Sequence, residues 1–206
     1  MMRLNPFDEP NVQESKDRTK ALLQRYARDH ALPPHEPPLL TDGTIKVFGD
    51  RARFSGDTLP ELLRGMFQQL DPKEYLAVLS FLPRSAALGG QLVALRKRLA
   101  EGVGVATILS HGPRYLHSLG QLYKGGPDQG VLWCLTCDEP DDVPIPGQPY
   151  TFRVLKHAQA IGDVQALRDH GRRVLHLHLG SAPEEDLARL LKAVEQAVKI
   201  AQESGR

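Results

Sequence analysis

Four largely apolar runs of strand length limit the folds that this chain can adopt. They span residues 75–82, 105–110, 131–136 and 173–180, and segments of helix or loop length separate them. A strand with one face in water alternates apolar and polar residues, whereas a continuous apolar run is typical of a strand buried on both faces. From residue 75 onward, the predicted order of elements is β-α-β-β-α-β-α.

This order predicts an α/β (α+β) fold, which we expect to be a two- or three-layer sandwich with a mixed sheet of about four strands. A split β-α-β unit has this order and packs its helices on one face of the sheet. The continuous apolar runs equally fit a sheet that is covered on both faces. The sequence leaves the order of the strands open.

Other patterns predict the remaining helices and a hairpin. Ile45 and Val47 alternate with polar residues, and the following Gly49-Asp50 pair predicts a hairpin turn. Thr58 and Glu61 form a capping box at the start of a helix that ends near residue 70. Further helices are predicted at 86–100, at 151–170 and after Ser181, which is expected to form a capping box with Glu184.

The N-terminal part is set apart by a cluster of prolines, namely Pro33, Pro34, Pro37 and Pro38. Because proline fixes φ and cannot continue a helix, residues 32–40 are predicted to be an extended linker. One helix is predicted before it, over about residues 9–30, with Asp8 as its N-cap. The expected organisation is a helix within 1–31, a linker at 32–40 and a domain at 41–206, which combines a hairpin and helix (41–71) with a sheet domain (72–206).

Composition excludes several classes of protein. The 26 lysines and arginines nearly balance the 25 acidic residues, and the net charge of +1 argues against a dedicated nucleic-acid binder. No apolar run approaches the roughly 18 residues of a membrane span, so no membrane partner is expected. With two cysteines and no apolar leader at the N-terminus, a cytoplasmic location is expected.

Lys16 stands out on the predicted N-terminal helix. At about 100° per residue it falls within the apolar stripe that contains Val12, Thr19, Leu23 and Tyr26, while most other charges lie opposite. A desolvated lysine has a lowered pKa, which suits acid–base chemistry or anion binding. Alternatively, its stem covers apolar surface while the ammonium reaches water.

The residues around this lysine resemble the C-terminal signature of phosphoglucose isomerase. That signature reads approximately N-P-F-D-Q-P-G-V-E-x-x-K and ends on an active-site lysine. The positions that match it without a gap are Asn5, Pro6, Phe7, Asp8, Pro10, Val12 and Lys16. The departures are Glu9, Asn11 and Gln13. The resemblance implies that Lys16 is a catalytic residue.

A second resemblance covers more of the chain. Residues 112–127, 145–152, 158–163 and 171–180 are similar to the C-terminal extension of bifunctional transaldolase/phosphoglucose isomerase proteins. This implies a role in the interconversion of glucose 6-phosphate and fructose 6-phosphate. The sugar-isomerase domains and the transaldolase barrel of such proteins have no counterpart in the chain. We therefore expect it to be inactive alone and to require sugar-isomerase domains as its partner, with no cofactor or metal; it could also form a homo-oligomer.

The glycine-rich segment at 112–127 contains four residues that could bind the sugar phosphate: Arg114, His117, Gln121 and Lys124. Glycines let the backbone approach a ligand, and arginine and lysine bind phosphate. The alternative is a basic surface loop shaped by tight turns. Cys134 with Cys137, and His176 with His178, are interpreted as structural pairs, because neither pair has the further ligands of a metal site.

Two functions follow from these patterns. In the first, the chain is the C-terminal part of a glucose-6-phosphate isomerase and contributes Lys16 to catalysis. In the second, it is a non-catalytic module that docks on sugar-isomerase domains. Only the first predicts that activity depends on Lys16.

Overall fold

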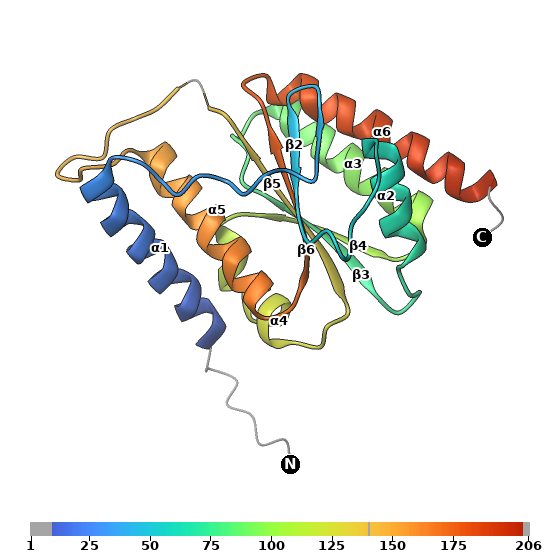
Figure 1. Ribbon diagram of the computed structural model, residues 1–206, viewed down its shortest axis with the longest axis horizontal. Coiled ribbons are helices and arrows are strands. Elements are labelled where there is room, and N and C mark those ends of the chain that lie inside the picture. Colours follow the sequence, from blue (N-terminus) through green and yellow to red (C-terminus); the bar gives the residue numbers. More distant parts are fainter. Residues whose placement is uncertain (1–9, 140, 204–206) are drawn as a thin grey trace, which may run out of the picture.

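A six-stranded sheet forms the centre of the computed structural model, which describes residues 10–139 and 141–203 (Figure 1). Its four strands from the second part of the chain are parallel: β3 (Tyr75–Ser80), β4 (Ala106–His111), β5 (Gly130–Cys137) and β6 (Arg173–Leu179). The hairpin of β1 (Leu40–Asp42) and β2 (Ile45–Phe48) adds two antiparallel strands beside β6. The strand order is β1-β2-β6-β5-β3-β4.

The runs that form β3, β5 and β6 are buried because their side chains have partners on both sides of the sheet, whereas β4 lies at the edge and is partly exposed. Leu76 and Val78 of β3 face one apolar cluster, and the alternate residues Ala77 and Leu79 face the other. Helices cover both faces, so the interpretation with a sheet buried on both sides is correct. The predicted class, a mixed α/β sandwich with an additional N-terminal helix, is confirmed.

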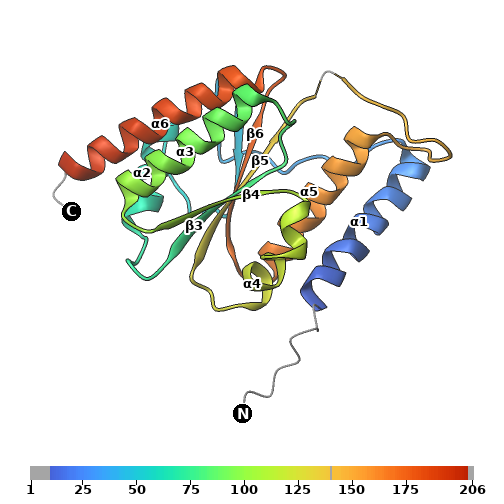
Figure 2. The ribbon, with the colours of Figure 1, turned by 180° about the vertical axis from the view of Figure 1, so that it is seen from behind.

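On the first face lie α2 (Leu59–Gln68), α3 (Ala86–Val103) and α6 (Pro183–Glu203), with α3 beside α6 (Figure 2). The predicted capping box of α2 is present, since Thr58 Oγ1 accepts a hydrogen bond from Glu61 N and Glu61 Oε2 accepts one from Thr58 N. The capping box expected at Ser181 is not formed. The last helix begins at Pro183, and Glu184 instead accepts a hydrogen bond from Ser85.

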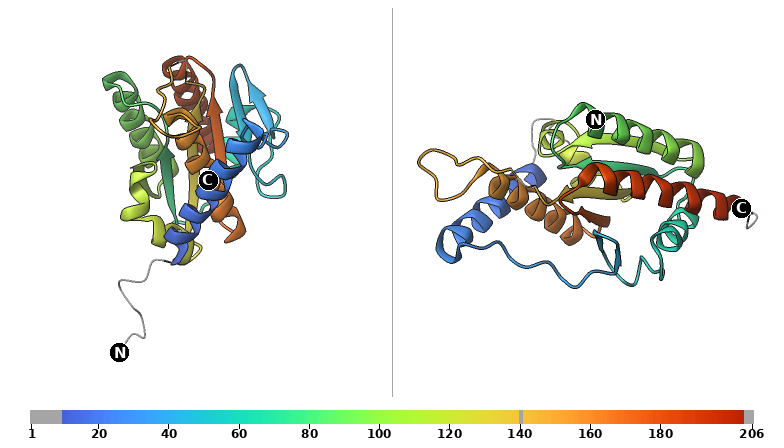
Figure 3. Two further views of the ribbon diagram at one scale, coloured as in Figure 1. Left: turned by 90° about the vertical axis from the view of Figure 1, so that its left-hand side faces the viewer. Right: turned by 90° about the horizontal axis from the view of Figure 1, so that it is seen from above.

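On the second face lie α4 (Gly120–Gly125) and α5 (Phe152–Asp169), and a 3-10 turn at Arg114–His117 precedes α4. The N-terminal helix α1 (Pro10–Asp29) packs against α5 and α4 and lies outside them, away from the sheet (Figures 1 and 3). Its predicted N-cap, Asp8, lies outside the described residues. No helix in the described ranges is long and apolar enough to cross a membrane.

Two boundaries differ from expectation. The hairpin turn falls at Gly43-Thr44, where Gly43 adopts a φ of 60°, and not at Gly49-Asp50. The hairpin also joins the main sheet, because Val47 pairs with Leu177, so residues 41–71 and 72–206 share one sheet. The proline-rich segment contains no helix or strand from residue 30 to 39, and Leu40, the last residue of the expected linker, begins β1.

Candidate functional site

The buried face of α1 determines where Lys16 lies. Val12, Ser15 and Leu22 are the buried residues of this helix. Gly162 of α5 permits the close approach, because a Cβ there would meet Arg18 Cβ and the backbone nitrogen of Thr19 at 3.3 Å. The prediction that Lys16 lies within the buried stripe is wrong. Ser15 occupies that position, and Lys16 is exposed on the flank of the helix.

Lys16 lies at the rim of a groove with a volume of about 470 Å³. One wall is α1, and the opposite wall is formed by α5, the residues before it and the segment leading to α4. Lys20, one turn after Lys16, is exposed at the same groove. The other lining residues are mostly apolar or uncharged: Ser15, Thr19, Leu23, Gln24, Ala27, Leu116, Gln148, Pro149, Tyr150 and Gln159. The groove therefore combines an apolar lining with two cationic groups.

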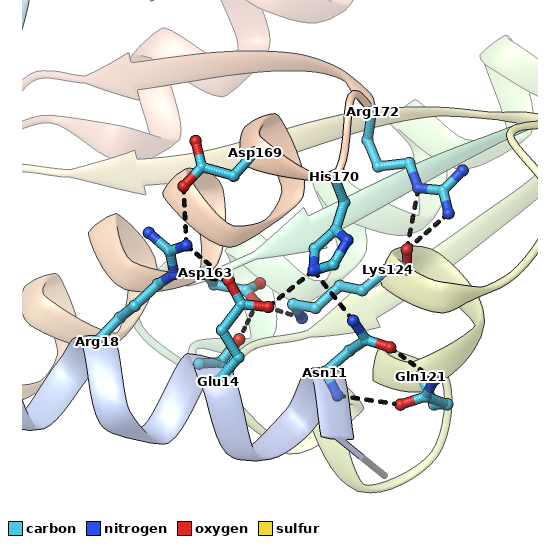
Figure 4. Close-up of polar contacts among 10 residues, drawn as sticks. Asn11, Glu14, Arg18, Gln121, Lys124, Asp163, Asp169, His170 and Arg172 are labelled. Atoms are coloured by element: carbon cyan, nitrogen blue, oxygen red, sulfur yellow. Dashed lines mark hydrogen bonds and ion pairs between the residues drawn. The ribbon is translucent and has the colours of Figure 1, made fainter.

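A buried ion pair lies beneath α1 (Figure 4). Lys124 Nζ is 2.5 Å from Asp163 Oδ1, and both side chains are almost fully inaccessible. Ser15 Oγ donates a hydrogen bond of 3.3 Å to the same carboxylate oxygen, and the Lys124 ammonium lies 5.8 Å from the centre of the Tyr115 ring. This cluster links α1, α4 and α5 at one point.

Burial disfavours both charges in this pair. Desolvation lowers the pKa of Lys124 to about 8 and raises the pKa of Asp163 to about 7. Because the two groups are 2.5 Å apart, each stabilises the charged form of its partner. The short contact couples the ionisation of the two groups, and neither member is available to a ligand in the groove.

A second, more exposed network surrounds the amino-terminal half of α1 (Figure 4). Glu14 lies 2.7 Å from His170 Nε2 and accepts hydrogen bonds from Arg18, which also pairs with Asp169 at 2.8 Å. Burial alone would raise the pKa of Glu14, but the hydrogen bonds from His170 and Arg18 outweigh it and lower the pKa. These contacts fix the rotation of α1 on the end of α5.

The four residues predicted at 112–127 do not form one phosphate site. This segment is mostly helical, and it places Arg114 and His117 on the exposed surface. Gln121 donates a hydrogen bond of 2.7 Å to Asn11 Oδ1 of α1, and Lys124 is buried against Asp163. The interpretation of Gln121 and Lys124 as phosphate ligands is therefore corrected: Gln121 binds Asn11 of α1, and Lys124 pairs with Asp163, the carboxylate to which Ser15 of α1 donates.

Sequence reasoning missed Ser15, Asp163 and His170. The one signal that could have located the contact is Gly162, since a glycine within an apolar helix often marks the close approach of another backbone. The two cysteines are free and buried, and burial raises the pKa of Cys134 to about 12 and that of Cys137 to about 11. Within residues 10–139 and 141–203, no group of three acidic, histidine or cysteine side chains is arranged to hold a metal.

Comparison with known proteins yields a likeness of fold only. The chain matches no protein-family model and no curated protein sequence. Its fold is similar to that of the hypothetical protein TT0462 from Thermus thermophilus, with a TM-score of 0.59 and 20% sequence identity. The match covers 68% of this chain and 38% of that chain, so it includes well under half of the neighbour's length.

Proposed function

We propose that this chain is the C-terminal portion of a glucose-6-phosphate isomerase of the kind fused to transaldolase, and that Lys16 is its catalytic residue. The observation that supports this is the position of Lys16, which is exposed at the rim of a groove and has no ion partner among the described residues. An amine that acts on a bound sugar must be accessible in this way. The partner is a set of sugar-isomerase domains in the cytoplasm.

The charge of the groove favours an anionic ligand. Lys16 and Lys20 are like charges at i and i+4 on one helix, an arrangement that costs about 0.2–0.5 kcal/mol. A phosphate or a carboxylate between or beside them relieves this repulsion. A sugar phosphate would bring the anion, and the uncharged Gln148, Gln159 and Thr19 offer hydrogen bonds to hydroxyl groups.

In this proposal Lys16 assists ring opening. The ammonium donates a proton to the ring oxygen as the ring bond breaks, and another group removes the proton of the anomeric hydroxyl. The later transfer of a proton from C2 to C1 requires a carboxylate base. None of the described residues that line the groove is acidic, so the base belongs to the sugar-isomerase domains.

The test is reconstitution of isomerase activity with matched variants. The chain is mixed with sugar-isomerase domains that lack their own lysine helix, and the conversion of glucose 6-phosphate to fructose 6-phosphate is measured. We expect activity to appear, and Lys16→Ala to reduce kcat by roughly 10²–10⁴-fold, as for loss of a general acid. Lys20→Ala is the control, since it removes the neighbouring charge and is expected to change KM more than kcat.

One observation favours the second function, a non-catalytic docking module. The helix α1 is packed on α5 and α4 of its own chain and is not held free for insertion elsewhere. In that case the chain would bind the sugar-isomerase domains with equal affinity before and after Lys16→Ala, and no activity would appear. Absence of both binding and activity would reject both functions.

A further inference from the structure

Four histidines from three parts of the chain meet on the α5 side of the sheet. His35 belongs to the proline-rich segment 30–39, His157 to α5, and His176 and His178 to β6. The ring centre of His35 is 5.5 Å from that of His176 and 5.5 Å from that of His178, and the His157 ring is 6.5 Å from His178. We call these four residues the histidine cluster.

A chain of hydrogen bonds connects the two inner histidines, His176 and His178, through the hydroxyl group of Thr136. Thr136 Oγ1 is 2.7 Å from His176 Nε2 and 2.8 Å from His178 Nδ1, and the other ring nitrogen of His178 is 3.2 Å from Asp138 Oδ1. A carboxylate accepts, so His178 Nε2 carries a proton and, in the neutral ring, Nδ1 accepts. The Thr136 hydroxyl then donates to His178 and accepts from His176. A proton added at His178 Nδ1 turns this nitrogen into a donor, so Thr136 Oγ1 must then accept from it and the direction of the hydrogen bonds changes.

His35 closes the cluster from the outside. Its ring stacks on Phe48 of β2, with centres 4.9 Å apart and an interplanar angle of 24°. The residues between α1 and Pro38 offer few other polar anchors: prolines lack an N–H group, Glu36 reaches Arg168 only at 3.5 Å, and the Pro38 carbonyl accepts from Arg51. At the end of the segment, the Leu39 amide donates a hydrogen bond of 2.7 Å to the Val47 carbonyl, which fixes that residue to the sheet independently of His35. The histidine ring is therefore a principal attachment of this segment to the sheet.

The charges around the cluster offer little compensation for added protons. Lys46 of β2, Arg168 and Lys156 of α5 are cationic, and Lys156 is paired with Glu139. Asp138 after β5 is the acidic group that acts on the rings directly. Glu36 is exposed and paired with Arg168. Protonation of two rings about 5.5 Å apart thus places like charges together in a partly buried site.

We propose that His35 is a pH-dependent latch, which holds the proline-rich segment on the sheet while the histidine cluster is neutral and releases it when the cluster is protonated. The ligand of this switch is the proton, and the element that it moves is the tether between α1 and β1. The latch does not depend on the isomerase function.

The direction of the pH dependence follows from the burial of the rings. Burial lowers the pKa of His35, His157 and His178, and it lowers that of His176 well below the ordinary value of 6.5. The closed state thus binds fewer protons than the open state, in which these pKa values return toward 6.5. Closure is fully favoured above pH 6.5 and is lost progressively as the pH falls through the lowered values.

The experiment follows the His35–Phe48 contact by NMR in the whole chain between about pH 7.5 and pH 5, a range that brackets the ordinary histidine pKa. In the wild type we expect the NOEs between the two rings to disappear at low pH, together with increased mobility of the His35 and Glu36 amides. His35→Phe keeps an aromatic ring on Phe48 but removes the titrating group, so the contact should persist at a pH at which the wild type is open. His30→Phe, at the exposed end of α1, is the control and should behave as the wild type.

Three results would overturn the latch. The first is a wild-type contact that persists to the lowest pH of the titration, and the second is a His35→Phe segment that opens at the same pH as the wild type. The third is loss of all dispersed amide signals at the same pH as the ring contact, because the transition would then be unfolding of the domain and not release of the segment.

Discussion

The two faces of the sheet are stabilised in different ways. On the side of α2, α3 and α6, the core consists mainly of leucines, valines and aromatic residues around Trp133. Apolar side chains of complementary shape pack against one another there. On the side of α5, α4 and α1, a smaller apolar cluster is interrupted by Lys124, Asp163, Thr136 and the histidine cluster. Buried polar groups require partners at fixed positions, so the second face determines how its helices are oriented. The first face supplies most of the hydrophobic stabilisation.

This difference predicts which face responds to a change of pH and how mutations on each face affect stability. An apolar contact has no titrating group, whereas burial shifts the pKa of several groups on the second face. We therefore expect mutations on the first face to lower stability at every pH, and mutations on the second face to change the pH dependence of stability or the position of α1.

The largest effect is expected from Trp133→Ala on the first face. Trp133 is fully buried, its ring lies 6.3 Å from that of Phe67, and its Nε1 donates to the Met66 sulfur. Loss of this side chain leaves a cavity and should cost about 3–5 kcal/mol in the free energy of unfolding. Urea unfolding at pH 6 and pH 8 measures it, and the cost should be the same at both. Val93→Ala, at an exposed position of α3, is the control.

A somewhat smaller and pH-dependent effect is expected from Lys124→Met. It leaves Asp163 buried without its partner, which should cost roughly 3 kcal/mol above pH 7. Burial raises the pKa of Asp163 above its unfolded value of 3.8, so the folded state gains protons as the pH falls. The cost of the mutation should accordingly shrink from pH 7 toward pH 4.

The double variant Lys124→Met/Asp163→Leu sharpens this test. It replaces both charges by apolar groups and should recover most of the lost stability, with little pH dependence. If the single variant is as stable as the wild type at pH 8, or if its cost grows as the pH falls, the ion pair does not stabilise the second face.

The smallest effect is expected from Ser15→Ala. The hydroxyl donates to Asp163 and has no other role in the packing of α1 that its methyl replacement would disturb. Removal should cost about 1 kcal/mol and act locally. Hydrogen exchange of the α1 amides measures it, with Ser118→Ala near α4 as the control. If hydrogen exchange accelerates equally in α1 and in β5, the effect of the mutation is not local. The stability of the second face could then not be distinguished from that of the whole sheet.

The regular elements could be predicted from sequence because their signals are local. Continuous apolar runs identified the parallel strands, and Thr58 with Glu61 marked the start of α2. The short helix α4 was missed, because six residues bounded by glycines show no apolar period. It is held by tertiary burial of Tyr123 and Lys124, which no local pattern reports.

The candidate site was harder to predict, because a small rotation of α1 about its axis determines whether Lys16 is buried or lines the groove. The actual buried stripe of α1 runs through Val12, Ser15 and Leu22, and at about 100° per residue its centre is about 45° from Val12, on the side away from Lys16. That shift moves Lys16 from the contact to the rim of the groove. The partners that set the rotation, Asp163 and His170, are more than 140 residues away in the chain.

The antiparallel pairing of β2 with β6 has a consequence for how the polypeptide acquires its structure during synthesis. Lys46 pairs with His178, and α1 packs on α5, so α1 and β2 find these native neighbours only after the residues of α5 and β6 have been synthesised. Such distant pairings are slow to form. Until then α1 and β2 lack these partners, and a chaperone that shields them would act in that interval.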